Sequence, residues 1–218
     1  MSARRLILLR HGQTAWNAEH RFQGHVDPPL DDVGREQARA AAEVLAAMQP
    51  DLLVSSDAMR AVQTAEFLAA ATGLPVRRDA RLRERGLGHW EGLTIADVAQ
   101  RFPDEYAEWT AGRDVSRPGG ETREQVAARV HAAVAQLPDV ALTIMVMHGA
   151  SSMALINALL GLDQDHRPLM SLSNCHWSEL AESPRNAAGG WRLWAHNVGL
   201  PDRQHAEPDE REAADAQA

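Results

Sequence analysis

The sequence predicts an α/β protein, a three-layer α/β/α sandwich whose mostly parallel sheet carries an antiparallel edge strand. Residues 6–9 and 142–147 are almost entirely apolar, without the polar alternation of a half-exposed strand. Such runs are typical of strands that helices cover on both faces. Residues 175–180 and 191–197 do alternate, which is typical of an edge hairpin. The composition is rich in Ala and Leu and only 5% aromatic, which favours helices packed on a sheet.

The first half of the chain has clear signals for where helices begin and end. Asp31 is a residue type that caps helices, and Pro50 cannot continue one. Gly73 is typical of a helix end. We therefore expect a strand at 6–9, a short helix at 15–20, a helix from 31 to about 48, a strand at 52–54, a helix at 58–71 and a strand at 76–78.

The second half begins with a polar, glycine-punctuated loop at residues 82–92. Thr94 with Asp97, and Thr122 with Gln125, have the spacing of capping boxes, in which the two side chains cap each other's backbone N–H groups. The elements expected here are helices at 94–101, 105–111 and 122–137, a strand at 142–147, a helix at 151–160 closed by Gly161, and the hairpin strands at 175–180 and 191–197.

Length and charge predict one domain over residues 1–200 and an acidic, disordered tail over 201–218. The net charge of the 218-residue chain is −8, and residues 202–218 hold six acidic and two basic side chains, which is −4 of that total. The tail lacks apolar residues to anchor it. No basic stripe predicts nucleic-acid binding, and no run approaches the roughly 18 apolar residues of a membrane helix. A single cysteine and no signal peptide favour a cytoplasmic protein.

Two apolar strands end in the same pair of residues, His11-Gly12 and His148-Gly149, and we expect the glycine after each histidine to give a ligand room beside the backbone. The carboxyl ends of parallel strands meet at one edge of a sheet, where ligands bind in α/β proteins. Arg10 precedes the first pair, and Arg60 begins the helix after another strand, with the positive end of that helix beside it. Glu84 lies in the loop after the third strand, so we expect all five polar side chains to converge.

These residue types suit phosphoryl transfer. Arginine orients phosphate oxygens bidentately, and histidine attacks phosphorus or moves a proton. A carboxylate can donate that proton, and Glu91 is the alternative to Glu84. The sequence lacks the motifs of other enzyme classes that cleave phosphate or acyl esters. It has no paired metal-ligand histidine pattern, no lysine for a P-loop, and no serine-hydrolase or cysteine-phosphatase motif. No metal and no cofactor are expected.

Five motifs follow one another along the chain: residues 9–14 with Asn17, Gln23-Gly24, Ser55-Ser56-Asp57 with Arg60 and Thr64-Ala65, Leu82-Arg83-Glu84 with Gly88 and residues 90–92, and His148-Gly149. In this order they resemble the histidine phosphatase superfamily, in the branch that holds phosphoglycerate mutases and broad-specificity phosphatases. The resemblance implies the phosphoglycerate mutase-like fold, a phosphohistidine at His11 and an acid/base role for Glu84. It also implies phosphoryl binding by Arg10, Arg60 and His148, and substrate binding by Asn17, Gln23, Gly24, Thr14 and Gly149.

The predicted function is metal-independent hydrolysis of a small phosphate monoester, of the sugar phosphate or phosphoglycerate type. A narrower similarity is to actinobacterial members that dephosphorylate glucosyl-3-phosphoglycerate. Two alternatives stay open: a phosphoglycerate mutase, and a non-catalytic phosphate-binding module. Arg113 and Arg117 are candidates to meet a substrate carboxylate. Trp177, Trp191 and Trp194 are expected in the core or in the interface of a homodimer.

Overall fold

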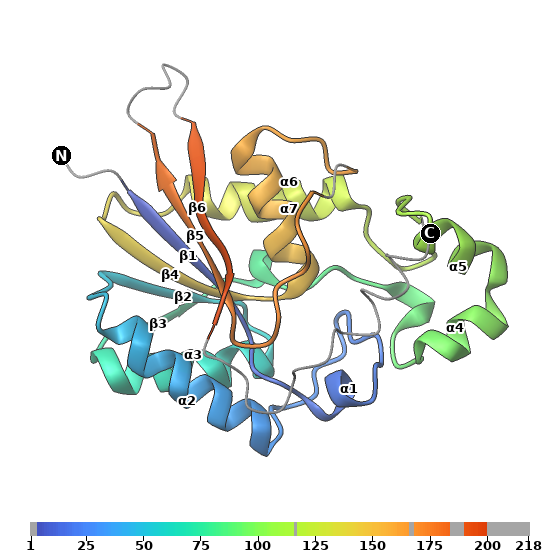
Figure 1. Cartoon of the computed structure of the whole chain (residues 1–218), viewed down its shortest axis with the longest axis horizontal. Helices are drawn as coiled ribbons and strands as arrows, with labels where there is room; N and C mark the ends of the chain where they lie inside the picture. Colours follow the sequence, from blue (N-terminus) through green and yellow to red (C-terminus); the bar gives the residue numbers. More distant parts are fainter. Residues whose placement is uncertain (1–3, 116, 166–167, 184–189, 200–218) are drawn as a thin grey trace.

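The computed structural model describes residues 4–115, 117–165, 168–183 and 190–199. Within these ranges it contains a six-stranded sheet in the order β3-β2-β4-β1-β5-β6 (Figure 1). The strands are β1 (Arg5–Arg10), β2 (Leu52–Ser55), β3 (Val76–Arg78), β4 (Leu142–Met147), β5 (Trp177–Glu182) and β6 (Trp191–Val198).

The sheet places the ends of the two apolar strands side by side. β1 and β4 pair in parallel, with Arg10 opposite Met147. β2 lies parallel to both β4 and β3. β5 runs antiparallel to β1, and β6 forms the edge beyond it as the second strand of the hairpin. The predicted fold class is therefore confirmed, with the antiparallel strand one position in from the edge.

Helices cover both faces of the sheet. α2 (Asp32–Ala46) and α3 (Met59–Thr72) pack on one face, and α6 (Arg123–Ala135) and α7 (Gly149–Leu160) on the other (Figure 1). Leu6 and Leu8 of β1 point into the core beneath α6 and α7, and Ile7 and Leu9 into the opposite core. Burying an aliphatic side chain of this size contributes about 1.5–3 kcal/mol, so β1 is a main source of stability.

The predicted helix caps are confirmed. Asp31 accepts from Gly34 N at 2.7 Å, Thr94 and Thr122 form the two capping boxes, and Gly73 ends α3 with φ +75°. Some boundaries were wrong by a few residues. α5 (Pro103–Thr110) begins two residues early because proline suits the first helical turn. β5 begins two residues late because Cys175 has φ +53°, which interrupts an extended strand.

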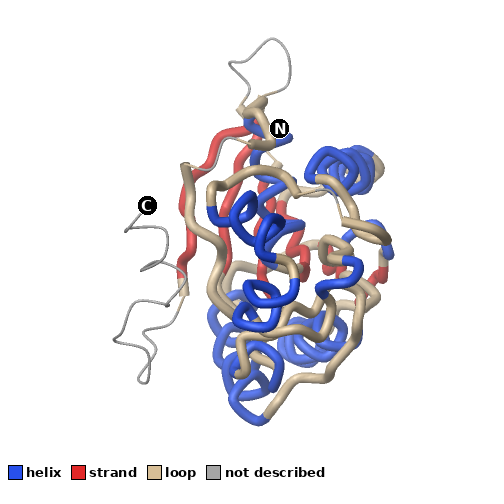
Figure 2. Tube along the Cα trace, turned by 90° about the vertical axis from the view of Figure 1, so that its right-hand side faces the viewer, coloured by secondary structure: helices blue, strands red, loops and turns tan. Residues whose placement is uncertain are grey.

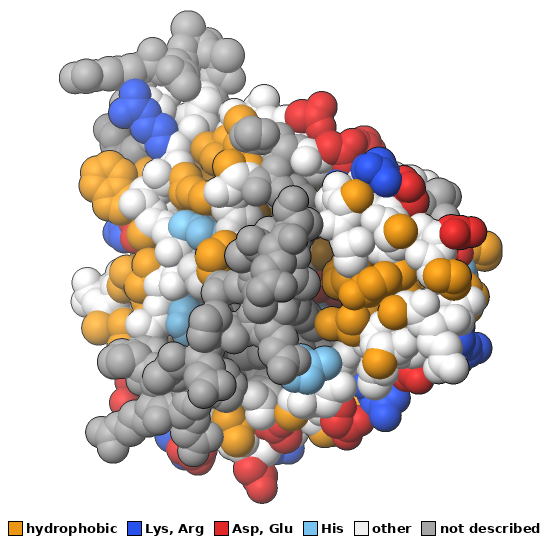
Figure 3. All heavy atoms as spheres, turned by 45° about the vertical axis from the view of Figure 1, so that its right-hand side comes forward, with side chains coloured by type: hydrophobic (Ala, Val, Ile, Leu, Met, Phe, Trp, Pro, Cys, Tyr) orange, Lys and Arg blue, Asp and Glu red, His pale blue; other side chains and the backbone are white. Residues whose placement is uncertain are grey.

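Three short α-helices, α1 (Ala15–Ala18), α4 (Ile95–Arg101) and α5, and two 3-10 helices at Ala80–Leu82 and Gly88–Trp90 complete the described elements. Figure 2, viewed from the side of α4 and α5, shows helices in front of the strands. Phe22, Trp90 and Trp109 join this part to the loop after β1, with ring centroids 5.1–6.0 Å apart. Figure 3 shows hydrophobic side chains at the surface on this side of the molecule.

Among the described residues no helix is both long and apolar enough to cross a lipid bilayer. The predicted disordered tail at 201–218 lies outside the described residues, as does most of the hairpin loop. Trp177 is buried as predicted and Trp191 packs against a core, but Trp194 is 74% exposed on β6. The homodimer stays a prediction.

Candidate active site

The parallel pairing of β1 and β4 brings the two predicted histidines together. His11 and His148 follow the paired residues Arg10 and Met147, and their ring centroids are 5.1 Å apart in an edge-to-face arrangement. Both side chains are buried, at 3% and 0% exposure. The expectation that both His-Gly pairs meet at one edge of the sheet is confirmed.

The hydrogen bonds of His11 fix which ring nitrogen carries the proton. Its Nδ1 lies 2.7 Å from the Gly12 carbonyl oxygen, which only accepts, so Nδ1 is the protonated nitrogen. Arg60 Nε donates to Nε2 across 3.3 Å, and Nε2 therefore holds a lone pair. Burial, followed by the charges of Arg60 and Arg10, lowers the pKa of His11 well below its usual 6.5. The ring is neutral and can act as a nucleophile.

His148 is oriented by a serine at the end of β2. Its Nε2 lies 2.9 Å from Ser56 Oγ, and that hydroxyl oxygen accepts from Ala58 N at 3.3 Å. The other ring nitrogen, Nδ1, has no hydrogen-bond partner among the described residues. Burial, Arg60, His11 and Arg10 lower the pKa of His148 well below 6.5. His148 can therefore donate a neutral hydrogen bond to a bound anion.

Arg60 connects the nucleophile to the loop after β1. Its side chain is 1% exposed, and its two terminal nitrogens donate to Val26 O at 2.9 Å and Gly24 O at 3.0 Å. The expectation that the positive end of its helix attracts phosphate stays a prediction. Both carboxylate oxygens of Asp27 accept from Met59 N at 2.8 Å, so this side chain already caps α3.

Arg10 and Glu84 meet beside Gly149. Arg10 Nη1 donates to Leu172 O at 2.5 Å. A Cβ atom at Gly149 would lie 3.8 Å from Glu84 Oε2, 3.9 Å from Arg10 Cζ and 3.1 Å from Ser171 Oγ. Gly149 thus leaves space in front of both charged groups, as the sequence predicts.

Gly12 serves a different purpose from Gly149. A Cβ there would lie 2.4 Å from Gly34 O, and a Cβ at Gly34 would lie 2.0 Å from Gln13 O. The interpretation of Gly12 as room for a ligand is therefore wrong. This glycine allows the start of α2 to approach the loop that carries His11.

Glu84 is held by the first turn of α7. Its Oε1 accepts from Arg85 N at 2.8 Å and Ser151 N at 3.0 Å, and its Oε2 accepts from Ala150 N at 3.1 Å. Oε2 has the single donor, so it keeps more capacity to carry a proton. This is also the oxygen that lies beside Gly149.

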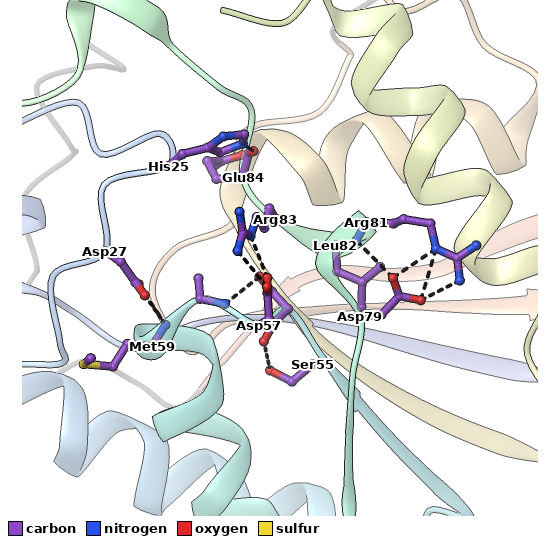
Figure 4. Close-up of polar contacts among 12 residues, drawn as sticks. His25, Asp27, Ser55, Asp57, Met59, Asp79, Arg81, Leu82, Arg83 and Glu84 are labelled. Carbon is purple, nitrogen blue, oxygen red and sulfur yellow. Dashed lines mark hydrogen bonds and ion pairs between the residues drawn. The ribbon is translucent and has the colours of Figure 1, made fainter.

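A cavity of about 150 Å³ opens next to Glu84. Its walls include Arg60, Glu84, Asp27 and Arg83. Figure 4 shows Arg83 between Asp57 and Glu84, and Arg83 pairs with the Asp57 carboxylate through two contacts of 2.7 Å. Charged groups and hydrogen-bonding atoms thus surround the space beside the predicted acid.

The alternative carboxylate, Glu91, has a structural position. Its Oε1 accepts from His25 N and Leu87 N, both at 3.0 Å, and it packs against Gly24. Gly24 has φ +54°, and a Cβ there would lie 2.1 Å from Glu91 Oε1. Gln23 is 8% exposed, and its side-chain oxygen has no hydrogen-bond partner among the described residues.

Thr14 and Asn17 cap α1 through each other. Thr14 N and Thr14 Oγ1 lie 3.1 and 3.0 Å from Asn17 Oδ1, and Asn17 N donates to Thr14 Oγ1. Thr14 is fully buried. The cap fixes the Asn17 oxygen and leaves its amide nitrogen to donate. The substrate contacts predicted for both residues stay predictions.

Two candidate cations do not reach the described cavity wall. Arg113 pairs with Glu108 at the surface. Arg117 is buried, with its guanidinium 3.9 Å from the centre of the Trp90 ring. Burial, with Arg85 nearby, lowers the pKa of Arg117 to about 10. A contact of either arginine with a substrate carboxylate stays a prediction.

Sequence reasoning assigned no individual role to several residues that shape the site, although Ser56 and Thr64 belong to the motifs named above. Ser56 follows a strand at the same sheet edge, and this position was a usable signal. Asn174 donates to His11 O at 2.9 Å, and Thr64 Oγ1 accepts from Gly12 N at 3.1 Å. Arg129 donates to the carbonyl oxygen of Glu84 at 2.8 Å. Nothing in the sequence near these last three residues indicates their contacts.

An α/β sandwich with two neutral histidines, Arg10 at the end of β1 and Arg60 in the first turn of α3 is the arrangement expected of a phosphoryl-transfer enzyme. No cluster of three or more His, Cys, Asp or Glu side chains suited to a metal ion occurs in the described ranges. The model of the histidine phosphatase superfamily (branch 1) matches residues 6–197. The chain belongs to this superfamily, and it is a histidine phosphatase, a phosphomonoester hydrolase.

Three relatives illustrate the similarity. Glucosyl-3-phosphoglycerate phosphatase of Mycolicibacterium vanbaalenii is 44% identical over 196 residues, which cover 85% of this chain and 87% of the relative. A Salmonella paratyphi C protein named "Probable phosphoglycerate mutase GpmB" is 34% identical over 191 residues, 85% of this chain and 89% of that protein. The structure of a mycobacterial glucosyl-3-phosphoglycerate phosphatase with VO3 has a TM-score of 0.84 at 42% identity, covering 90% and 100% of the two chains.

Proposed function

We propose that this phosphatase hydrolyses glucosyl-3-phosphoglycerate through a phosphohistidine on His11, without a metal ion. The observation that carries the mechanism is the state of His11 Nε2, which is unprotonated and lies 3.3 Å from Arg60 Nε. The substrate rests on the relatives of that name, at 44% identity in sequence and a TM-score of 0.84 in structure.

In the first step, His11 Nε2 attacks phosphorus and the bond to the alcohol oxygen breaks. Binding of the phosphate moves the Nε–H of Arg60 from the histidine lone pair to a phosphoryl oxygen, which frees the nucleophile. Arg10 and the Nδ1–H of His148 stabilise the remaining negative charge. Glu84 Oε2 gives its proton to the departing oxygen.

In the second step, Glu84 takes a proton from water, and that water attacks the phosphohistidine. The bond between phosphorus and nitrogen breaks, inorganic phosphate leaves, and His11 returns to its neutral form. Glu84 is again protonated, so the cycle closes without net proton transfer to any other residue. The cavity beside Glu84 gives the alcohol portion a polar space next to the acid.

The test is rapid mixing with glucosyl-3-phosphoglycerate, followed by acid or alkaline quenching and mass analysis of the protein. We expect an alkali-stable phosphoryl group on the peptide that contains His11, and free phosphate as product. His11→Asn should show no phosphoprotein and a turnover lower by about 10³-fold or more. The control is His131→Asn, because His131 is exposed on α6. Wild-type turnover in His11→Asn would overturn the mechanism.

A panel of phosphorylated sugars and glycerates tests the substrate separately. Glucosyl-3-phosphoglycerate should have the highest kcat/KM of the panel. A member that exceeds it by tenfold or more would replace it as the substrate and leave the phosphohistidine mechanism intact.

A phosphoglycerate mutase is the second candidate, because a relative with that name is 34% identical. A mutase has to keep water from its phosphohistidine and bind the second acidic group of the substrate. This chain contains no lysine for that task. Conversion of 3-phosphoglycerate to its 2-isomer faster than phosphate release would establish the mutase instead.

A further inference from the structure

We propose that Arg129 of α6 is a positioning residue that sets the location of the Glu84 carboxyl group, with Glu121 as its anchor. The inference rests on the proposed role of Glu84 as the acid. Arg129 therefore governs proton donation to the leaving group without touching the reacting atoms.

All five N–H groups of the Arg129 guanidinium have an acceptor. Nε donates to Glu121 Oε1 and Nη2 to Glu121 Oε2, both at 2.8 Å. Nη1 donates to Arg81 O and Arg83 O at 2.7 Å, and the second proton of Nη2 goes to Glu84 O at 2.8 Å. A planar fork of five donors matches this set, and the single ammonium of lysine cannot.

The loop that carries Glu84 lacks regular secondary structure, and the contacts of Arg129 hold its backbone instead. Residues 83–87 belong to no helix or strand, and their backbone pairing is limited to single contacts such as the bridge of Leu87 with Gly120 and the bond from Glu121 N to Gly86 O at 2.9 Å. Arg129 supplies donors to the carbonyl groups, and Glu121 Oε2 accepts from Gly86 N at 2.8 Å. His25 Nε2 also lies 2.9 Å from Glu84 O. Without such partners a loop of this kind would sample several conformations.

The two ends of Glu84 are held by different helices. Arg129 on α6 fixes its backbone, and Ala150 and Ser151 at the start of α7 fix its carboxyl oxygens. α6 and α7 pack against each other on one face of the sheet, so both anchors belong to one layer (Figure 1). Proton transfer requires hydrogen-bond distance to the leaving oxygen, so a displaced backbone would weaken this step first.

The contacts of Arg129 and Glu121 determine which variants test the proposal. Arg129→Lys keeps the positive charge, and therefore the electrostatic influence on His148, but it loses the fork. Glu121→Gln keeps the shape of the anchor and loses its charge. Arg81→Lys is the matched control, because Arg81 also connects the loop region to α6, through Gln136 Oε1 at 3.0 Å, without touching Glu84.

The experiment compares two substrates that differ in leaving group. p-Nitrophenyl phosphate needs little protonation of its leaving oxygen, and glycerol 3-phosphate needs a full proton. We expect Arg129→Lys to lower kcat/KM for glycerol 3-phosphate by about tenfold or more, within the range for general acid catalysis. The loss for p-nitrophenyl phosphate should be under about threefold. Glu121→Gln should show the same pattern more weakly, and Arg81→Lys should leave both values unchanged.

Glu84→Gln and the double variant with Arg129→Lys distinguish this inference from the proposed function. If Glu84→Gln loses equal activity on both substrates, Glu84 is not the acid and the proposed function fails at that residue. If Glu84→Gln discriminates between the substrates and Arg129→Lys does not, only the positioning role is overturned. The double variant should be no slower on glycerol 3-phosphate than Glu84→Gln, because both substitutions remove the same contribution, proton donation by Glu84. Additive losses would contradict the inference.

Discussion

Arg60 donates from Nε to Nε2 of His11 across 3.3 Å, inside a pocket where both side chains are almost fully buried. This contact has two consequences. The guanidinium charge disfavours protonation of the ring, which keeps the nucleophile neutral. Its other nitrogens hold the carbonyl groups of Gly24 and Val26, so the same residue shapes the loop beside the cavity.

Arg60→Lys should therefore lower kcat/KM by about 10²-fold or more, as expected when a donor to the developing charge is removed. Lysine keeps the charge but cannot reach three separate acceptors from one fork. The measurement is hydrolysis of glucosyl-3-phosphoglycerate together with the inhibition constant of vanadate. Arg39→Lys is the control, because Arg39 pairs with Glu36 at the surface of α2. A loss under about threefold in Arg60→Lys would contradict this interpretation.

The free energy of unfolding should decrease as the pH is lowered below about 6.5, partly because of the two buried histidines. Their folded-state pKa values are well below 6.5, so the unfolded chain binds protons there that the folded chain does not. Each histidine contributes a slope of up to about 1.4 kcal/mol per pH unit to the free energy of unfolding. Urea denaturation between pH 7 and 5 should give a shallower slope for His11→Asn than for the wild type. Parallel slopes would mean that His11 takes up a proton in the folded state.

Gly34→Ala should destabilise the protein although Gly34 lies inside α2. Helix propensity alone favours alanine by up to about 1 kcal/mol. A Cβ at this position would lie 2.0 Å from Gln13 O, so the backbone near His11 has to move. We expect the free energy of unfolding to drop by about 2 kcal/mol or more, as in overpacked cores. Glu43→Ala, an exposed change on the same helix, should have little effect. A more stable Gly34→Ala would show that the contact relaxes freely.

Chelators should leave activity unchanged. In the proposed mechanism Arg10, Arg60 and the neutral His148 provide the electrostatic stabilisation that a metal ion supplies in metallophosphatases. The check is turnover after overnight dialysis against EDTA, with addition of Zn²⁺ or Mg²⁺ to a second sample. Inactivation by EDTA that either ion reverses would require a metal site that the described residues do not contain.

Local signals in the sequence were sufficient to predict the helices and strands and the side chains that lie at the strand ends. Capping residues such as Asp31 and Thr122 act over three or four positions, so their effect can be predicted from neighbouring residues alone. The strand ends were also predictable, because an apolar run that stops at a histidine places that histidine at the edge of the sheet. His11 and His148 followed directly from this pattern.

The sequence thus determined which side chains meet at the ends of the strands, and the tertiary structure decided how each is held. Ser56 orients His148 from another strand, and Arg129 supports Glu84 from a helix 45 residues further along the chain. Asp27 caps the first turn of α3 from the loop after β1. Such contacts depend on how helices and loops pack over the sheet, and residues distant in sequence meet only after that packing is complete. The neutral state of the two histidines is decided at the same stage, because it depends on burial and on the positions of Arg10 and Arg60.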